Sequence, residues 1–329
     1  MKKQKSRETI EIRKSPGISR NFMSAKELTL LTFNTGYACH DTASSFRAHI
    51  IKPMQRRKCS PDQVRKNLNR MSDFLLQTDA DIVLLQEVDR HSTRTGGMDQ
   101  HNHFQSALPQ YGASFAWNFR VKWIPVPLQK PVGKVYAGLS TFFRHPVAEA
   151  SRIQLPGREH WPRRQFDLHR CLAEHRMLLD NERSLFIFNL HLSAFDRKGH
   201  LRKLEMQEIK KRAAMLAQEG HYVIFGGDWN HDLTTASEED HLQQPVDRPS
   251  WLMPLRPSHK PGGFHWAYDG SIPTVRETHA PYDPNATFTA VIDGFLMSEN
   301  VQILDIKTHD LSFEPSDHHP VTCKVRLLD

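Results

Sequence analysis

The sequence of 329 residues lacks any long apolar run, and this absence excludes a class of protein. No stretch approaches the roughly 18 consecutive apolar residues of a membrane-spanning helix, so we predict no transmembrane segment. The first residues, MKKQKSRETIEIRKSPGISR, are charged and have no apolar core. That is not the pattern of a secretory signal peptide.

Cysteine is also scarce, with four scattered residues and no Cys-x-x-Cys pair: Cys39, Cys59, Cys171 and Cys323. This usage is typical of a reduced, intracellular protein, and we expect a cytoplasmic location. The twenty histidines do not indicate zinc, because no Cys/His set has the spacing of zinc ligands. No feature of the sequence indicates a protein partner, and we expect a monomer.

Acidic residues are few only at the N-terminus, and this determines the net charge of +7. Residues 1–26 hold eight Lys or Arg and two Glu, a net charge of +6, whereas the other 303 residues carry 36 basic and 35 acidic side chains. We predict a flexible basic tail over 1–26 and a single domain over 27–329. The tail could hold polyanions, and a solvated extension without a partner explains it equally well.

Hydrophobic patterning predicts many strands and few long helices. Ser60-Pro61 is typical of a helix N-terminus, and apolar residues at helical spacing follow it. We expect helices at 61–77 and 200–218, and strands at 28–34, 81–87, 111–119, 135–143, 146–154, 168–179, 184–192, 221–230, 289–298, 301–309 and 319–328. Residues 245–284 contain eight prolines and should form a long irregular excursion. This content favours two packed sheets flanked by helices.

Polar clusters stand at the ends of several of these apolar strands. They are Asn34, Gln86-Glu87, Asn189-Leu190-His191, Gly227-Asp228-Trp229-Asn230, Ile292-Asp293-Gly294 and Ser316-Asp317-His318. Each short cluster could merely cap a strand, but their joint occurrence indicates a site on loops held by a sheet. Carboxylate and amide oxygens suit a hard cation such as Mg²⁺. Imidazoles suit proton transfer, and an Asp bonded to a His would orient that ring.

The order Asn … Gln-Glu … Asn-x-His … Gly-Asp-x-Asn … Ile-Asp … Ser-Asp-His resembles the endonuclease/exonuclease/phosphatase superfamily. The resemblance spans roughly residues 28–328, and GDWN and SDHHP are its most specific parts. It implies an α/β fold of the DNase I type, a four-layer α-β-β-α sandwich of two mostly antiparallel sheets flanked by helices. It also implies hydrolysis of phosphate esters with a divalent metal, Mg²⁺ or Mn²⁺.

The resemblance further implies a role for each matching residue. Asn34, Glu87 and Asp317 would hold the metal. Asp228 would orient or deprotonate the attacking water, and Asn230 would hold a phosphate oxygen. His191 would bind phosphate or donate a proton, and His318, oriented by Asp293, would stabilise the transition state or act as acid and base. Asn34 is followed by Thr35-Gly36 where endonucleases of the family carry a bulkier residue, which weighs against abasic DNA as substrate.

We therefore predict a metal-dependent phosphodiesterase acting on a phosphate ester, with nucleic acid as the leading substrate. Two alternatives remain open from the sequence. The same enzyme chemistry could act on sphingomyelin or on an inositol or sugar phosphate. A non-catalytic polyanion-binding protein on the same fold is the other alternative, although a binder of phosphate gains nothing from clustered carboxylates.

Overall fold

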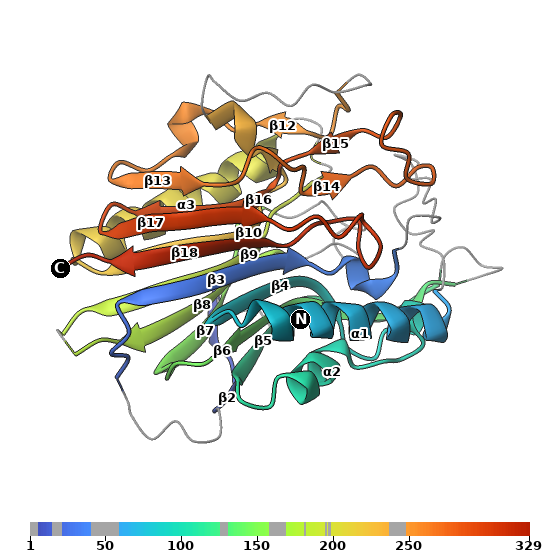
Figure 1. Ribbon diagram of the computed structural model, residues 1–329, viewed down its shortest axis with the longest axis horizontal. Coiled ribbons are helices and arrows are strands. Elements are labelled where there is room, and N and C mark those ends of the chain that lie inside the picture. The colour runs from blue at the N-terminus through green and yellow to red at the C-terminus, as the bar shows by residue number, and fades with distance from the viewer. Residues whose placement is uncertain are drawn as a thin grey trace.

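The computed structural model describes residues 6–14, 22–40, 59–125, 131–157, 169–180, 182–194, 196, 199–236 and 248–329 (Figure 1). Two seven-stranded sheets lie face to face. The β3 sheet has the order β17 (Val301–Thr308), β18 (Val321–Leu327), β3 (Glu27–Asn34), β4 (Ile82–Asp89), β6 (Gly133–Phe143), β5 (Gly112–Ile124) and β2 (Ile12–Arg13). The β10 sheet has the order β1 (Arg7–Thr9), β7 (Glu149–Gln154), β8 (Cys171–Leu178), β9 (Ser184–His191), β10 (Tyr222–Asp228), β16 (Asp293–Ser298) and β13 (Phe264–Ala267).

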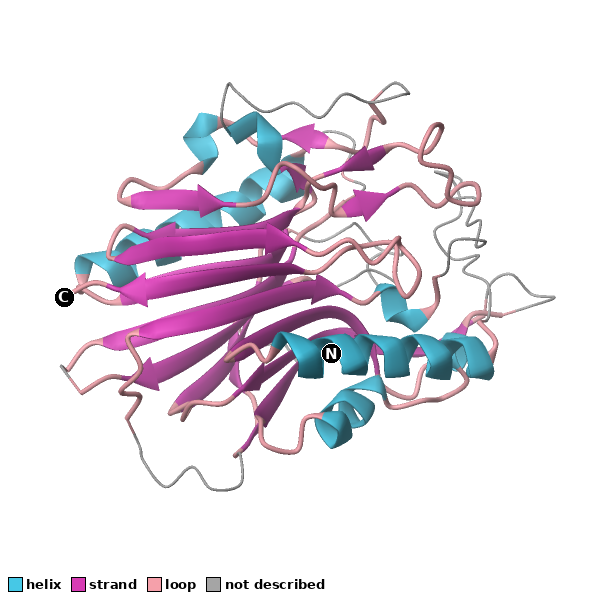
Figure 2. Cartoon of the chain, viewed as in Figure 1, coloured by secondary structure: helices cyan, strands magenta, loops and turns pink. Residues whose placement is uncertain are grey.

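Helices cover the outer faces of both sheets (Figure 2). The β3 sheet carries α1 (Pro61–Thr78) and α2 (Gln100–Ala107), and the β10 sheet carries α3 (His200–Gln218). Short elements complete the described chain: η1 (Gly36–Ala38), η2 (Thr93–Thr95), η4 (Leu233–Ala236), η5 (Pro257–His259), β11 (His231–Asp232), β12 (Met253–Pro254), β14 (Val275–Arg276) and β15 (Thr289–Ala290). The predicted four-layer sandwich is confirmed.

Three apolar layers account for the near-continuous hydrophobic runs of the central strands. Leu30 of β3 and Leu84 of β4 point into the core between the sheets, while Leu31 and Phe33 pack under the helices. Both faces of such a strand are buried, so the strict alternation of a half-exposed strand disappears. Most pairs are antiparallel, but β3–β4 and β9–β10 are parallel.

Local signals placed the helix boundaries well. Ser60 caps α1, because its hydroxyl accepts a hydrogen bond from the backbone N–H of Gln63 at 3.1 Å, and Pro61 follows in the first turn. The predicted helices at 61–77 and 200–218 are α1 and α3. Helix α2 was not predicted from the sequence. Its eight residues carry few apolar side chains.

The N-terminal segment differs from the predicted flexible tail. Arg7–Thr9 extends the edge of the β10 sheet by pairing with β7, and Ile12–Arg13 extends the edge of the β3 sheet by pairing with β5. Arg7 also bonds the buried carboxylate of Glu174 at 2.5 Å. The segment therefore ties the two sheets together along one side of the sandwich. We call residues 6–14 the N-terminal clasp.

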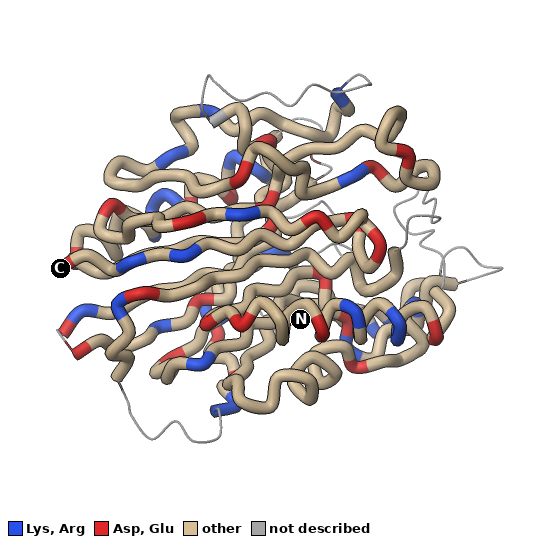
Figure 3. Tube along the Cα trace, viewed as in Figure 1, with Lys and Arg blue, Asp and Glu red and all other residues tan. Residues whose placement is uncertain are grey.

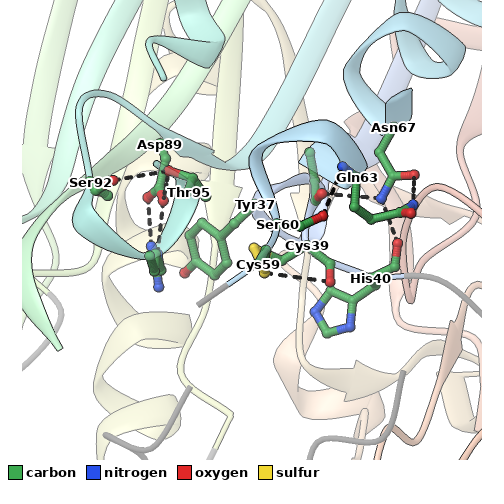
Figure 4. Close-up of a disulfide and its surroundings, with 12 residues drawn as sticks. Tyr37, Cys39, His40, Cys59, Ser60, Gln63, Asn67, Asp89, Ser92 and Thr95 are labelled. Atoms are coloured by element: carbon green, nitrogen blue, oxygen red, sulfur yellow. Dashed lines mark hydrogen bonds and ion pairs between the residues drawn. A yellow bond between two sulfur atoms is a disulfide. The ribbon is translucent and has the colours of Figure 1, made fainter. Parts of the chain in front are cut away.

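Two further expectations need correction. The excursion at 245–284 is not irregular throughout, because Phe264–Ala267 forms β13 at the edge of the β10 sheet. The expectation of reduced cysteines is wrong for Cys39 and Cys59, which form a disulfide with Cα atoms 5.6 Å apart (Figure 4). Sequence spacing gave no sign of this pair. No helix of the described chain is long and apolar enough to cross a membrane.

Candidate active site

The polar strand ends meet at one edge of the sandwich. The parallel pairing sets Asn34 of β3 beside Gln86 of β4, and Asp228 of β10 beside His191 of β9. The antiparallel pairing of β10 with β16 sets Asp228 opposite Asp293. Strand direction and register therefore bring side chains from distant parts of the chain to one place.

Asp228 lies at the centre of this group and is 1 % exposed. Its Oδ2 atom accepts a hydrogen bond from Nδ2 of Asn34 at 2.9 Å, and its Oδ1 accepts one from the backbone N–H of Asn230 at 2.9 Å. Nε2 of His191 lies 3.3 Å from the same Oδ2, and Nε2 of His318 lies 3.9 Å away. Burial, and after it the nearby carboxylate of Asp293, raise the pKa of Asp228 to about 7 against the lowering effects of His318 and Asn34. A carboxyl group with this pKa can exchange a proton near neutral pH.

His318 and Asp293 form the second part of the site. Oδ2 of Asp293 lies 2.8 Å from Nδ1 of His318, and both residues are buried. Burial alone would lower the pKa of His318, but Asp293, Asp228 and Asp317 raise it to about 10. The ring is therefore an imidazolium at neutral pH, with its Nε2 turned toward Asp228. The other oxygen of Asp293 is buried without a hydrogen-bond partner.

Asn230 is held by its backbone and its amide. It has a left-handed φ of 49°, and its Nδ2 donates to the carbonyl of Leu192 at 2.9 Å. Arg202, which is 1 % exposed, donates to the carbonyl of Asn230 at 3.2 Å. Trp229, between Asp228 and Asn230 in the sequence, is fully buried, and its Nε1 donates to the carbonyl of Gly294. The GDWN segment is thus fixed in place by packing, as a site that requires fixed geometry needs.

The turn Thr35–Gly36 joins the predicted metal ligands. The hydroxyl of Thr35 donates to the carbonyl of Glu87 at 3.1 Å, and Gly36 packs against Asp317. A Cβ atom on Gly36 would lie 2.7 Å from Oδ1 of Asp317, and the φ of Gly36 is +52°. Glycine is required here for both reasons. Thr35-Gly36 follows Asn34 where endonucleases of the family carry a bulkier residue. The close contact of Gly36 with Asp317 explains why this chain has glycine there.

Glu87 itself sits in a β-bulge with a φ of 56°. A non-glycine residue in this region costs about 1 kcal/mol and is found mainly where the surroundings enforce it. Contacts of the following loop provide this constraint. Two residues after Glu87, the buried Asp89 accepts two hydrogen bonds from Arg94, of 2.8 and 2.6 Å. The guanidinium of Arg94 lies 3.4 Å from the ring centre of Tyr37. These contacts hold the loop after Glu87 against the segment after Asn34.

Figure 4 shows the segment from Tyr37 to His40 lying between Asp89 on one side and Asn67 on the other. Nδ2 of Asn67 donates to the carbonyls of Ala38 and His40, at 3.1 and 2.6 Å. Nε2 of His40 lies 3.5 Å from Oδ2 of Asp317. The sequence gives no indication that His40 approaches Asp317. A contact across 277 positions leaves no local signal.

Two sets of residues could hold a cation. The backbone carbonyl of Glu87, Oδ1 of Asp317 and the amide oxygen of Asn34 approach the Thr35–Gly36 turn, and the side-chain oxygens of these three residues are hard ligands that suit Mg²⁺. Within the described parts of the chain, Asp228, Asp293 and His318 are the group of carboxylates and imidazoles with ligand atoms all within 4.8 Å of one another. The unpartnered Oδ1 of Asp293 would suit a cation, but the bond from Asp293 to the His318 ring occupies the other oxygen.

Residues 31–318 match the model of the endonuclease/exonuclease/phosphatase family. No curated protein sequence matches the chain.

Solved structures match over most of the chain, at low sequence identity. An endonuclease/exonuclease/phosphatase from Beutenbergia cavernae is 14 % identical, covers 92 % of this chain and 72 % of its own, and has a TM-score of 0.59. A family protein from Bacteroides thetaiotaomicron is 18 % identical, with coverages of 92 % and 98 % and a TM-score of 0.55. TDP2 from D. rerio, in complex with a single strand DNA product, is 13 % identical, with coverages of 92 % and 100 % and a TM-score of 0.55. At these identities the likeness shows the fold.

Proposed function

The chain belongs to the endonuclease/exonuclease/phosphatase family, and on this premise we propose that it is a divalent-metal-dependent phosphodiesterase that hydrolyses nucleic acid by in-line attack of water. One observation carries the proposal. The buried Asp228 lies within 2.9 Å of Asn34, 3.3 Å of His191 and 3.9 Å of His318. A carboxylate, an amide and two imidazoles from four separate segments therefore surround one small volume.

The proposed division of roles follows from the charges in that volume. Asp228 orients or deprotonates the attacking water, because its pKa near 7 lets it accept a proton at neutral pH. The imidazolium of His318, kept charged by Asp293, stabilises negative charge that develops on the phosphoryl oxygens. His191 binds phosphate or donates a proton, and Asn230 holds a phosphate oxygen.

We propose Glu87, Asp317 and Asn34 as the ligands of Mg²⁺ or Mn²⁺. The metal would neutralise phosphate charge and polarise the bond to phosphorus. We prefer this set to Asp228, Asp293 and His318, because the hydrogen bond between Asp293 and His318 already gives those two groups a joint role. A cation bound there would also oppose the positive charge of the imidazolium.

Nucleic acid is the substrate class that we favour over a lipid or a small phosphate ester. The D. rerio protein of similar fold has been crystallised with a single strand DNA product, and the basic residues of the N-terminal segment suit a polyanion. A monomer in the cytoplasm stays part of the proposal. The Cys39–Cys59 disulfide is an argument against a cytoplasmic location, because disulfides persist mainly in oxidising compartments.

A substrate panel tests the proposal. Purified protein is assayed with Mg²⁺, Mn²⁺ or excess chelator on single-stranded and duplex oligonucleotides, bis(p-nitrophenyl) phosphate, p-nitrophenyl phosphate and sphingomyelin vesicles. We expect metal-dependent cleavage of oligonucleotides, and a loss of at least about 10²-fold in turnover for Asp228→Asn. The matched control is Asp305→Asn, the same chemical change at an exposed position of β17. Full activity in chelator would rule out the metal, and preference for sphingomyelin or a monoester would replace the substrate.

A further inference from the structure

Strands β5 and β6 continue past the end of the β3 sheet. The last pair between β4 and β6 is Asp89 with Ala137. The pairing of β5 with β6 goes on, through Arg120 with Tyr136 and Val121 with Val135, to Ile124 with Gly133. This two-stranded extension, residues 117–124 and 133–138, is here called the β5–β6 ribbon. It leaves the sheet at the same end as the candidate active site, because Asp89 follows Glu87 by two residues.

Aromatic rings and cations alternate on the ribbon. Trp117 and Tyr136 meet edge to face, with ring centres 5.9 Å apart. The guanidinium of Arg120 lies 5.5 Å from the ring centre of Trp117 and 5.8 Å from that of Tyr136, and Nζ of Lys134 lies 5.3 Å from the ring centre of Tyr136. From the next loop, Arg90 lies 5.8 Å from the ring centre of Trp117. Neither Trp117 nor Tyr136 is buried.

The ribbon is also the place where a large ring is left in solvent. Trp123 is 58 % exposed, and its neighbour Lys122 is exposed as well. Among the described residues from Gly112 to Tyr136, Arg120, Lys122 and Lys134 are basic and none is acidic. Figure 3 shows that the rest of the described chain carries both signs of charge. A cationic, aromatic surface of this kind is complementary to a polyanion that carries planar groups.

Backbone bonds fix the base of the ribbon relative to the site. The carbonyl of Tyr136 accepts from the backbone N–H of Arg90 at 2.7 Å and from the hydroxyl of Ser92 at 2.9 Å. The carbonyl of Trp117 accepts from Nε of Arg152 at 2.6 Å. Arg152 belongs to β7 of the other sheet and is 2 % exposed. The backbone at Trp117 is therefore held from the other sheet and that at Tyr136 from the loop after β4, so little backbone entropy is lost when a ligand binds at the base of the ribbon.

We propose that the β5–β6 ribbon is a stacking platform for the unpaired bases of a single-stranded nucleic acid whose phosphodiester reaches the candidate active site. The inference rests on the proposed function and names its substrate as single-stranded. Bases stack on the exposed Trp123 and on the partly exposed rings of Trp117 and Tyr136, while Arg120 and Lys122 contact phosphates. In a duplex the base faces are covered by stacking, so the rings of the ribbon gain less from it.

A lipid surface is the less suitable partner for the same residues. Insertion into a bilayer interface requires several exposed apolar side chains on one face. Of the large apolar side chains exposed in the described chain, only Trp123 belongs to the ribbon, and the others lie at Phe22, Leu76, Met215 and Leu328. The ribbon therefore offers one inserted ring at most, together with several cations placed beside half-buried rings.

The test uses full-length protein carrying Asp228→Asn, so that bound oligonucleotides are not cleaved in Mg²⁺. Fluorescence anisotropy measures binding of a labelled 20-nucleotide oligo(dT), an oligo(U) of the same length and a 20-base-pair duplex. Trp123→Ala should weaken binding of both single strands about tenfold and of the duplex less than twofold. Phe22→Ala, which removes another exposed ring (54 % exposed), should change neither. Arg120→Gln with Lys122→Gln should reduce the salt dependence of binding, whereas Lys203→Gln with Lys211→Gln on α3 should not.

Several results would overturn the platform. They are unchanged binding of both single strands by Trp123→Ala, an equal loss for the duplex, absence of single-strand binding by the parent protein, or loss only of binding to sphingomyelin and phosphatidylcholine vesicles. Hydrolysis of bis(p-nitrophenyl) phosphate by the Trp123→Ala variant with Asp228 intact separates the two proposals. It should equal that of the parent, because Trp123 is outside the reacting group. If Trp123→Ala selectively loses single-strand binding but the parent protein cleaves no oligonucleotide, the stacking platform is supported. The proposal that the active site hydrolyses nucleic acid is then wrong.

Discussion

Nδ2 of Asn34 lies 2.9 Å from Oδ2 of Asp228, and this hydrogen bond joins the last residue of β3 to the last residue of β10. The two strands belong to different sheets, and the residues are 194 positions apart in the chain. Both side chains are buried, so the bond is shielded from water. The candidate site is therefore built across the interface between the sheets.

The Asp293–His318 pair should behave as one unit in catalysis. His318→Ala should lower turnover at least about 10²-fold, since it removes the imidazolium. Asp293→Asn should cause a part of that loss, because the ring loses the 2.8 Å bond that orients it. Turnover of the double variant should then be close to that of His318→Ala alone. Losses that simply multiply would show that the two residues act separately.

Gly36→Ala should reduce activity more than its backbone conformation alone explains. The added Cβ would lie 2.7 Å from Oδ1 of Asp317 and 2.6 Å from Cδ2 of His40. The control is Gly97→Ala, where φ is +78° and nothing lies within 4 Å. Both variants should lose about 1 kcal/mol of stability from the left-handed conformation. Only Gly36→Ala should raise the Mg²⁺ concentration needed for half-maximal activity, and an equal metal dependence in both would remove Asp317 from the metal site.

Deletion of residues 1–14 should destabilise the protein rather than merely shorten a tail. It removes β1 and β2, exposes the edges of β7 and β5, and leaves the buried carboxylate of Glu174 with Arg212 alone. Urea denaturation should give a lower midpoint than for the full chain. Deletion of residues 1–5 serves as the control, because the clasp then remains. Equal midpoints for the full chain and the longer deletion would mean that the clasp adds nothing to stability.

Buried neutral histidines should make the protein less stable in mild acid. Burial lowers the pKa of His175 to about 4 from its usual 6.5, and Ser114 holds its ring at 2.6 Å between β5 and β8. The stabilisation from the neutral ring is therefore complete above pH 6.5 and is lost as pH falls from 6.5 toward 4. Between pH 7.5 and 5.5 the free energy of unfolding should fall by about 1 kcal/mol on account of this residue. His175→Gln should remove that part of the pH dependence, and the exposed His200→Gln should not.

The Cys39–Cys59 disulfide should be detectable in protein purified without reductant. Alkylation of the unfolded chain should then modify only Cys171 and Cys323, which are free. Reduction should lower the melting temperature, since the bond closes a loop of about 20 residues and such bonds contribute about 3 kcal/mol in the chain-entropy model. The double variant Cys39→Ser with Cys59→Ser should melt at the same temperature with and without reductant. Alkylation of all four cysteines before reduction would restore the expectation of a reduced protein.

The sequence by itself determined the elements and the chemical groups of the candidate site. The short apolar run before Gln86-Glu87 predicts a strand buried on both faces, and Ser60-Pro61 predicts the start of a helix without any tertiary contact. Polar residues at the ends of such strands were expected either to cap the strands or to form a site at the sheet edge. The order of these motifs resembles that of the family, and the resemblance implied the four-layer fold.

Only the tertiary structure decided which of these groups meet. The alternation of a strand fixes the face on which a side chain lies, but not the neighbouring strand or the sheet. The bond from Asn34 to Asp228, the approach of His40 to Asp317 and the Cys39–Cys59 pair all depend on register and on chain reversal. The clasp of residues 6–14 escaped prediction for the same reason. Its strands are two and three residues long and are stabilised by the free sheet edges that they pair with, not by any pattern of their own.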